Sequence, residues 1–209
     1  MKINLNEIYS QLEAWRHERG ITAESQKEGY VVNVMEELGE LAGALRCYEQ
    51  IKEFLNKNKG KMCGYQYHKH SLMLIEAEHE IIDAICDIAV FTINAGVDVN
   101  CNKKINTINT TQTTRCNSSL SFLLNECGSF DYYGNFSSYI CFNEILLSCT
   151  KICENYGFNF EIAMLETIKE ISSRTGSYDE ATKKWVKDSG DEAQAKWYKA
   201  DYEKARIKQ

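Results

Sequence analysis

Apolar side chains recur every three to four residues along most of the chain, which is the spacing of one face of an α-helix. This pattern predicts helices over about residues 6–19, 30–55, 71–95, 120–127, 137–156 and 161–173. Gly20 and Gly96 follow two of these segments, at the position where glycine commonly ends a helix. The sequence therefore predicts an all-α fold, a helical bundle, in which the polar run 22–29 is a connection.

Two of the predicted helices carry acidic residues within their apolar stripes. Glu37 and Glu40 are three residues apart, so their Cβ atoms lie about 5–6 Å apart on one helix face. Glu80 and Asp83 repeat this spacing on the next long helix, and Asp87 extends the acidic stripe by one turn. The apolar residues between them direct both helices into a common core, so we expect the two acidic pairs to face each other.

Carboxylates that face one another near a core need a compensating charge. Removing each from water without a partner costs several kcal/mol. A hard divalent cation between the two pairs would offset this cost, and oxygen ligands suit Mg²⁺, with Mn²⁺ as the alternative. The hypothesis is therefore that Glu37, Glu40, Glu80 and Asp83 are ligands of Mg²⁺.

The order of these residues resembles a known family signature. Glu36-Glu37-x-x-Glu40 followed by Glu80-x-x-Asp83 is similar to the EExxE…ExxD pattern of the all-α nucleoside triphosphate pyrophosphohydrolases. That superfamily includes MazG-like enzymes, dimeric dUTPases and phosphoribosyl-ATP pyrophosphohydrolases. The resemblance is close over residues 28–98, where an apolar helix ending in Gly-Val-Asp follows the ExxD, and looser from 155 onward. The 39 residues between Glu40 and Glu80 exceed the spacing of compact MazG-like members.

The resemblance implies an Mg²⁺-dependent hydrolase that cleaves (deoxy)nucleoside triphosphates to monophosphate and pyrophosphate, in nucleotide-pool house-cleaning or a dUTPase-like role. It implies that Glu37 or Glu40 orients or deprotonates the attacking water. Asp87 is expected behind the metal ligands or at a further metal ion, and Glu36, about 100° around the helix from Glu37, at the edge of the site. A homodimer or homotetramer is also implied, because core helices of this superfamily assemble with a partner chain.

A segment suited to phosphate follows the last predicted core helix. Lys169 and Ser173 are four residues apart, and Arg174 begins an Arg-Thr-Gly-Ser-Tyr run. A cation, hydroxyl groups and glycine can meet phosphate oxygens with little steric obstruction. The segment resembles the Lys-x-x-x-(Ser/Asn)…Gly-Ser-Tyr stretch of phage-type nucleotide pyrophosphohydrolases and dimeric dUTPases. Lys169, Ser173 and Arg174 are therefore expected to bind the β- and γ-phosphates, and the resemblance favours a deoxynucleotide.

The resemblance also suggests the domain organisation. We expect a single MazG-like domain over residues 1–209, with core helices at about 6–97 and 156–174. An insertion at about 98–155 would contain a helix pair and an Asn/Thr/Ser-rich loop at 99–119. Residues 175–209, amphipathic around Trp197, would form a lid or a docking arm.

Composition narrows the function further. The net charge of −6 argues against a nucleic-acid surface. The resemblance implies a nucleoside triphosphate substrate as the partner. Nine cysteines without a CxxC pair indicate a reducing, cytoplasmic setting. We expect no signal peptide and, because the sequence has no long apolar run, no membrane association.

Other metal sites are less well supported by spacing. Cys63, His68 and His70, with Cys47 upstream, could form a zinc site, but their spacing matches no standard pattern. Glu76 and His79 spell the ExxH half-motif of di-iron bundles, which need a second ExxH that this chain lacks.

The alternative function needs no catalysis. Acidic residues three apart on a helix are usually a solvated face, and lone charges such as Lys169 usually lie on the surface. The chain would then be a non-catalytic α-helical oligomer whose acidic stripes are solvated or bind ions structurally. In either case Trp185 and Trp197 are expected to be packing residues.

Overall fold

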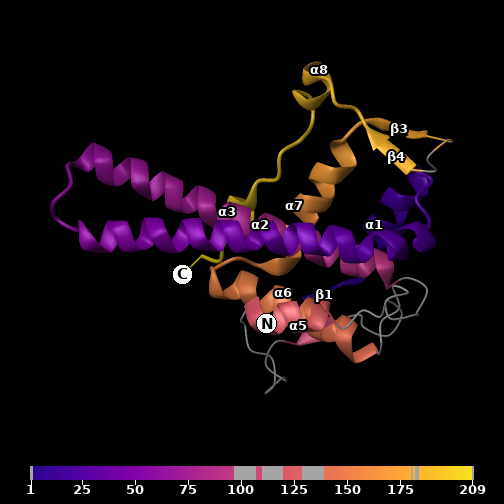
Figure 1. Cartoon of the computed structure of the whole chain (residues 1–209), viewed down its shortest axis with the longest axis horizontal. Coiled ribbons are helices and arrows are strands. Elements are labelled where there is room, and N and C mark those ends of the chain that lie inside the picture. The colour runs from indigo at the N-terminus through magenta and orange to yellow at the C-terminus, as the bar shows by residue number, and fades with distance from the viewer. Residues whose placement is uncertain are drawn as a thin grey trace.

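The computed structural model describes residues 2–96, 107–109, 120–128, 139–179, 181 and 184–208. Most of these residues are helical, which confirms the predicted all-α class (Figure 1). Two helices lie within the region predicted as an insertion, α5 (Leu120–Cys127) and α6 (Tyr139–Asn155), within two residues of the expected bounds. Of the polar segment predicted as a loop at 99–119, only residues 107–109 belong to the described part.

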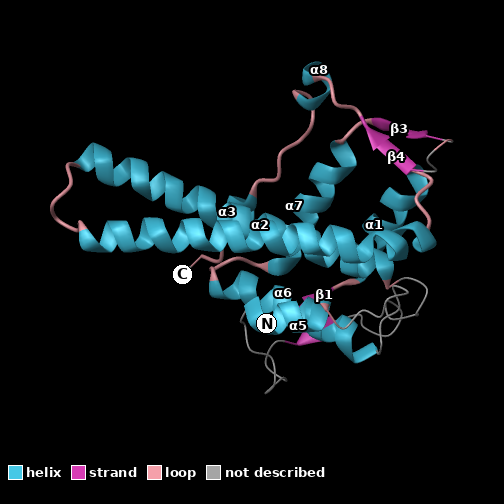
Figure 2. Ribbon diagram, in the orientation of Figure 1, coloured by secondary structure: helices cyan, strands magenta, loops and turns pink. Residues whose placement is uncertain are grey.

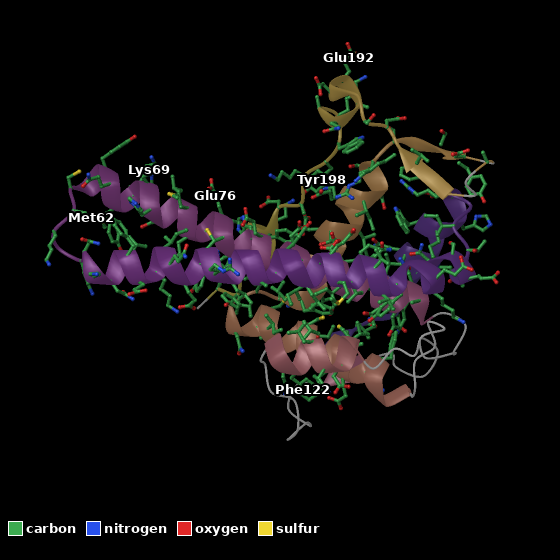
Figure 3. The ribbon with its side chains drawn as sticks, in the orientation of Figure 1. Met62, Lys69, Glu76, Phe122, Glu192 and Tyr198 are labelled. Carbon is green, nitrogen blue, oxygen red and sulfur yellow. The ribbon has the colours of Figure 1, made fainter. Side chains whose placement is uncertain are left out.

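A long antiparallel hairpin of α2 (Ala23–Lys57) and α3 (Gly64–Ala95) dominates the structure. The turn between them lies at one end of the molecule, away from the other helices, so the outer half of the hairpin projects from the body (Figure 1). Met62 and Lys69 mark this projecting end (Figure 3). The inner half of the hairpin, which carries the acidic pairs, packs against the remaining helices.

Both hairpin helices begin earlier than the sequence pattern predicts. The polar run 22–29 was expected to be a connection, but helix α2 already starts at Ala23. Thr22 caps it, because its side-chain oxygen accepts a hydrogen bond from Ser25 N at 3.1 Å. Similarly, α3 starts at Gly64 and not at residue 71. Residues 64–69 of α3 are exposed and residues 23–29 of α2 are exposed or half-buried, so their polar composition does not prevent helix formation.

The hydrophobic core surrounds the C-terminal half of α3. The helices α1 (Asn6–Glu18), α6 and α7 (Phe160–Ser173) pack around it. From residue 81 to 95 nearly every α3 side chain is buried, and the partly exposed ones are Asp83, Asp87 and Phe91. A helix that is apolar on all sides is expected to be surrounded by other helices. The two aspartates are thus the polar exceptions on an otherwise apolar segment.

Two short antiparallel ribbons complete the fold, and neither was predicted (Figure 2). Strand β1 (Lys2–Asn4) pairs with β2 (Thr107–Asn109). Strand β3 (Gly176–Asp179) pairs with β4 (Lys184–Lys187), with Tyr178 directly opposite Trp185. Strands of three or four residues are too short to show the alternation on which sequence interpretation depends.

The chain after β4 contains only short helical turns, α8 (Asp191–Gln194) and the 3-10 helix η2 (Tyr202–Ala205). We call residues 198–206 the C-terminal strap, because they run across α7 and α3 of the same chain. Asn159 N donates to Ala205 O at 2.7 Å, and Arg206 pairs with Glu78 of α3 at 2.9 Å. Tyr202 is the strap residue whose large side chain is buried against the body of the protein. In the part of the chain described, no helix combines the length and apolar character needed to cross a membrane.

Two glycines give a matched test of this packing. In Gly96→Ala the added methyl carbon would lie 2.6 Å from Cε2 of the fully buried Phe142, so we expect a loss of about 1–3 kcal/mol in unfolding free energy. In Gly43→Ala no atom lies within 4 Å of the added carbon, and the α2 helix should gain about 1 kcal/mol. Urea unfolding of both variants measures the difference; equal midpoints would show that Phe142 moves aside freely.

Candidate active site

Acidic residues from α2 and α3 meet on one face of the inner hairpin. The carboxyl group of Glu37 on α2 interacts electrostatically with Glu40 of its own helix and with Asp83 of α3. Asp87 of α3 interacts in turn with Asp83 and Glu37. The antiparallel pairing of the two helices therefore brings the first acidic stretch of the sequence opposite the second.

Glu37 is the acidic residue of α2 that is drawn furthest into this face. Its side chain is half-buried, whereas Glu36 and Glu40 are exposed. Burial raises the pKa of Glu37 to about 7, and repulsion from Glu40, Asp83 and Glu36 adds to the effect. The group therefore exchanges its proton near neutral pH, far above the usual range of a glutamate.

The two aspartates of α3 lie deeper. Burial raises the pKa of Asp83, although the hydroxyl of Tyr202 donates a hydrogen bond to Asp83 Oδ1 at 2.5 Å and opposes the shift. Burial also raises the pKa of Asp87 well above its usual value, followed by repulsion from Asp83 and Glu37. Burial and repulsion from neighbouring carboxylates thus disfavour the charged form of Glu37, Asp83 and Asp87 alike.

Helix α7 adds a glutamate and an arginine to the face. Arg174 Nη2 pairs with Glu170 Oε1 at 2.9 Å, and its positive charge lowers the pKa of Glu37, Asp83 and Asp87. Glu170 in turn raises the pKa of both aspartates. Arg174 was among the expected phosphate-binding residues, whereas Glu170 was missed. Their i, i+4 spacing at the C-terminal end of the helix is the sequence signal that could have identified the pair.

Glu80 lies to one side of this group. It is exposed, and it lines a cavity of about 330 Å³ between α3, α7 and the C-terminal strap. The cavity is also lined by Glu76, His79, Asp83, Glu170, Lys199, Ala200 and Tyr202. Asp83 and Glu170 therefore connect the cavity to the face on which Glu37 lies. Tyr202, which was assigned only to an amphipathic arm, is a contact of the site through Asp83.

Lys169 and Ser173 face the C-terminal strap. The ammonium group of Lys169 lies 3.8 Å from the ring centroid of Tyr198, and Ser173 Oγ accepts a hydrogen bond from Tyr198 N at 2.8 Å. Tyr198 lies beside α7 (Figure 3), where its hydroxyl also donates to Glu166. Of the three expected phosphate-binding residues, Arg174 is therefore the one that the structure brings to the acidic face.

The donor set of this face suits a hard cation, but the side chains do not form a finished cage. The candidate donors are carboxylate oxygens, which Mg²⁺ and Mn²⁺ prefer, and a cation would relieve the repulsion that raises their pKa values. In the described part of the chain, however, no group of three or more His, Cys, Asp or Glu side chains is arranged to hold a metal ion. Holding one requires these side chains to turn toward a common point.

For the zinc and di-iron sites considered from the sequence, the described residues likewise contain no group of side chains arranged to hold a metal ion. His70 stacks on Phe54 with ring centroids 4.5 Å apart, on the projecting half of the hairpin. His79 pairs with Glu203 of the C-terminal strap at 2.9 Å. Both histidines thus have structural contacts outside a zinc or di-iron arrangement.

Comparison with models of known protein families, with curated proteins and with solved structures finds no match. The resemblance to the all-α pyrophosphohydrolases therefore depends on the residues of this chain alone. Those residues are the two acidic motifs on α2 and α3 and the segment around Arg174.

Proposed function

We propose that this chain is an Mg²⁺-dependent pyrophosphohydrolase that cleaves (deoxy)nucleoside triphosphates to the monophosphate and pyrophosphate. One observation carries the proposal: Glu37, Asp83 and Asp87 are held together from two helices although each repels the others and burial disfavours their charge. Groups whose pKa values are strongly shifted occur preferentially at functional sites. A divalent cation bound with a polyphosphate would offset the repulsion among these carboxylates.

Each residue has a chemical role in this proposal. When bound, Mg²⁺ neutralises charge on the phosphate oxygens and polarises water. Glu37, Glu40, Glu80 and Asp83 are the proposed ligands, with Asp87 behind them and Glu36 at the rim. Glu37 or Glu40 would also orient the attacking water or accept its proton.

Arg174 is the proposed phosphate-binding cation. Its guanidinium fork matches phosphate oxygens geometrically and is already directed to the acidic face by Glu170. Lys169 and Ser173 would join it only after releasing Tyr198. Their contribution to phosphate binding therefore depends on movement of the C-terminal strap.

The alternative is a non-catalytic helical oligomer whose acidic face is solvated or binds ions. The observation in its favour is that no metal-binding group is arranged among the described residues. Glu36, Glu40 and Glu80 are also exposed, as in an ordinary solvated face.

We also propose that the chain forms a homodimer or homotetramer. Apolar side chains on the outer face of α2 support this, since Val31, Val32 and Met35 are 47%, 63% and 62% exposed. Light scattering coupled to size-exclusion chromatography measures the assembly, and a monomer at micromolar concentration would refute it.

A pyrophosphate-release assay tests the function. Purified protein with Mg²⁺ is offered dUTP, dATP, dGTP, dCTP, dTTP and the ribonucleotides, with Glu40→Gln as the control. We expect Mg²⁺-dependent release that this variant loses, and the substrate ranking identifies the preferred base. If no nucleotide of the panel yields pyrophosphate, the non-catalytic alternative is favoured.

A further inference from the structure

A second cavity lies beyond the acidic face, at the start of α2. It has a volume of about 290 Å³ and separates the α1–α2 connection from the β3–β4 hairpin. In Figure 1 this hairpin lies next to the end of the bundle where α1 leads into α2. The cavity is at the small end of ligand-binding pockets, a size that suits one ring system better than a whole nucleotide.

Two aromatic side chains form its wall on the hairpin side. Tyr178 and Trp185 are opposite each other on β3 and β4, so their rings lie on the same face of the ribbon. Arg19 holds the indole: its guanidinium carbon lies 5.0 Å from the Trp185 ring and 5.3 Å from the Trp15 ring. Trp185 also packs directly over Gly176, where an added Cβ would lie 2.6 Å from its ring.

The position of Arg19 links this wall to the acidic face. Arg19 Nη2 donates to the carbonyl oxygens of Ser172 at 2.9 Å and of Arg174 at 3.2 Å. The residue that supports Trp185 therefore also fixes the backbone of the proposed phosphate-binding arginine. A shift of either side would be transmitted to the other through one buried side chain.

Two amides form the opposite wall. Gln26 and Asn33 are seven residues apart on α2 and so lie on the same helix face, both lining the cavity. Neither side chain has a hydrogen-bond partner within the part of the chain that the structure describes. An amide offers a donor and an acceptor together, the pattern with which Asn and Gln recognise base edges.

Asn33 and Glu37 are four residues apart on α2 and so lie on the same face of that helix. Glu37 follows Asn33 by one helical turn, about 6 Å along the helix axis. A ligand held by the amides and aromatic rings would therefore extend its substituents toward the carboxylates. The charge of that end must be compensated by cations, as it is for a polyphosphate with Mg²⁺.

We propose that this cavity binds the base of the nucleotide substrate, stacked against Trp185 or Tyr178 and recognised at its edge by Gln26 and Asn33. The inference rests on the proposed function for the identity of the ligand, and it assigns Trp185 a binding role where the sequence indicated only packing. Aromatic stacking accepts any base, whereas the amides distinguish bases by their donors and acceptors.

Binding without hydrolysis gives the first test. Tryptophan emission is titrated with the deoxynucleoside monophosphates dAMP, dGMP, dCMP, dUMP and dTMP. We expect saturable quenching that Trp185→Phe removes and Trp197→Phe retains. Asn33→Leu and Gln26→Leu should each weaken binding of the preferred monophosphate about tenfold, whereas Gln50→Leu, on the projecting half of α2, should not. Absence of quenching, or equal weakening by Gln50→Leu, would overturn the inference.

Substrate ranking in the pyrophosphate-release assay gives the second test and separates the two proposals. We expect Asn33→Leu to flatten the ranking of bases about tenfold through KM, with kcat for the preferred substrate little changed. Hydrolysis whose ranking is unaffected by this variant would remove the base site and leave the hydrolase. Specific quenching by monophosphates without any hydrolysis would keep the base site and remove the hydrolase.

Discussion

Asp83→Asn is expected to lower pyrophosphate release by about 10²–10³-fold, the loss typical of removing one charged group that stabilises a transition state. Asp83 is the carboxylate at which the acidic face and the 330 Å³ cavity meet. The fold should survive, because the asparagine side chain keeps an oxygen that can accept the hydrogen bond from Tyr202. Initial rates and circular dichroism measured on the same preparation test both parts.

A matched change outside the site is Asp188→Asn, on the exposed segment after β4. It removes the same charge from the chain but should leave the rate within about twofold, since exposed charges contribute little. If Asp83→Asn retained near-wild-type activity with normal helicity, the assignment of the acidic face as the active site would be wrong.

Glu37→Gln should make the metal-free protein more stable at pH 8 while removing its activity. A carboxyl whose pKa rises from 4.5 to about 7 on folding binds more protons in the folded state, so stability falls as pH increases through that window. Because Glu37 is only half-buried, we discount the shift for solvent screening to about 1–2 kcal/mol. At pH 8 the variant should then melt about 2–8 °C above wild type. At pH 4.5 the variant and wild type should melt at the same temperature.

Magnesium provides a readout of the same site that does not need turnover. At pH 8, Mg²⁺ should raise the melting temperature of wild type more than that of Glu37→Gln, because the cation relieves repulsion that the variant has already lost. The control Glu53→Gln, exposed on the projecting half of α2, should respond like wild type. Equal shifts in all three proteins would show that Mg²⁺ binds elsewhere.

The sequence was most informative where periodicity is long. Six of the helices, including the hairpin pair, were predicted because their apolar stripes extend over several turns. The facing of Glu37 and Asp83 followed from the same stripes, since both residues interrupt them. The pattern did not predict where α2 and α3 start, because their first turns carry polar residues without an apolar stripe; Thr22 caps α2, whereas no side chain caps α3.

Contacts between distant segments account for most of what was missed. Tyr202 reaches Asp83 across 119 residues, and no local pattern encodes that pairing. Likewise, Trp185 lines a cavity only because a four-residue strand pairs with β3 and turns its ring toward Gln26 and Asn33. Glu170 was not predicted, because its i, i+4 spacing to Arg174 is also common on solvated helix faces.

The C-terminal strap also sets the order in which the site can be completed during synthesis. The α2–α3 hairpin is translated before α7 and the strap, so Asp83 at first lacks its contact with Tyr202. Arg206 and Lys204 then fasten the strap to Glu78 of α3 and Glu166 of α7. At about 5–20 residues per second, the 119 residues between Asp83 and Tyr202 take about 6–24 s to emerge. During that interval Asp83 lacks the hydrogen bond that opposes the rise in its pKa.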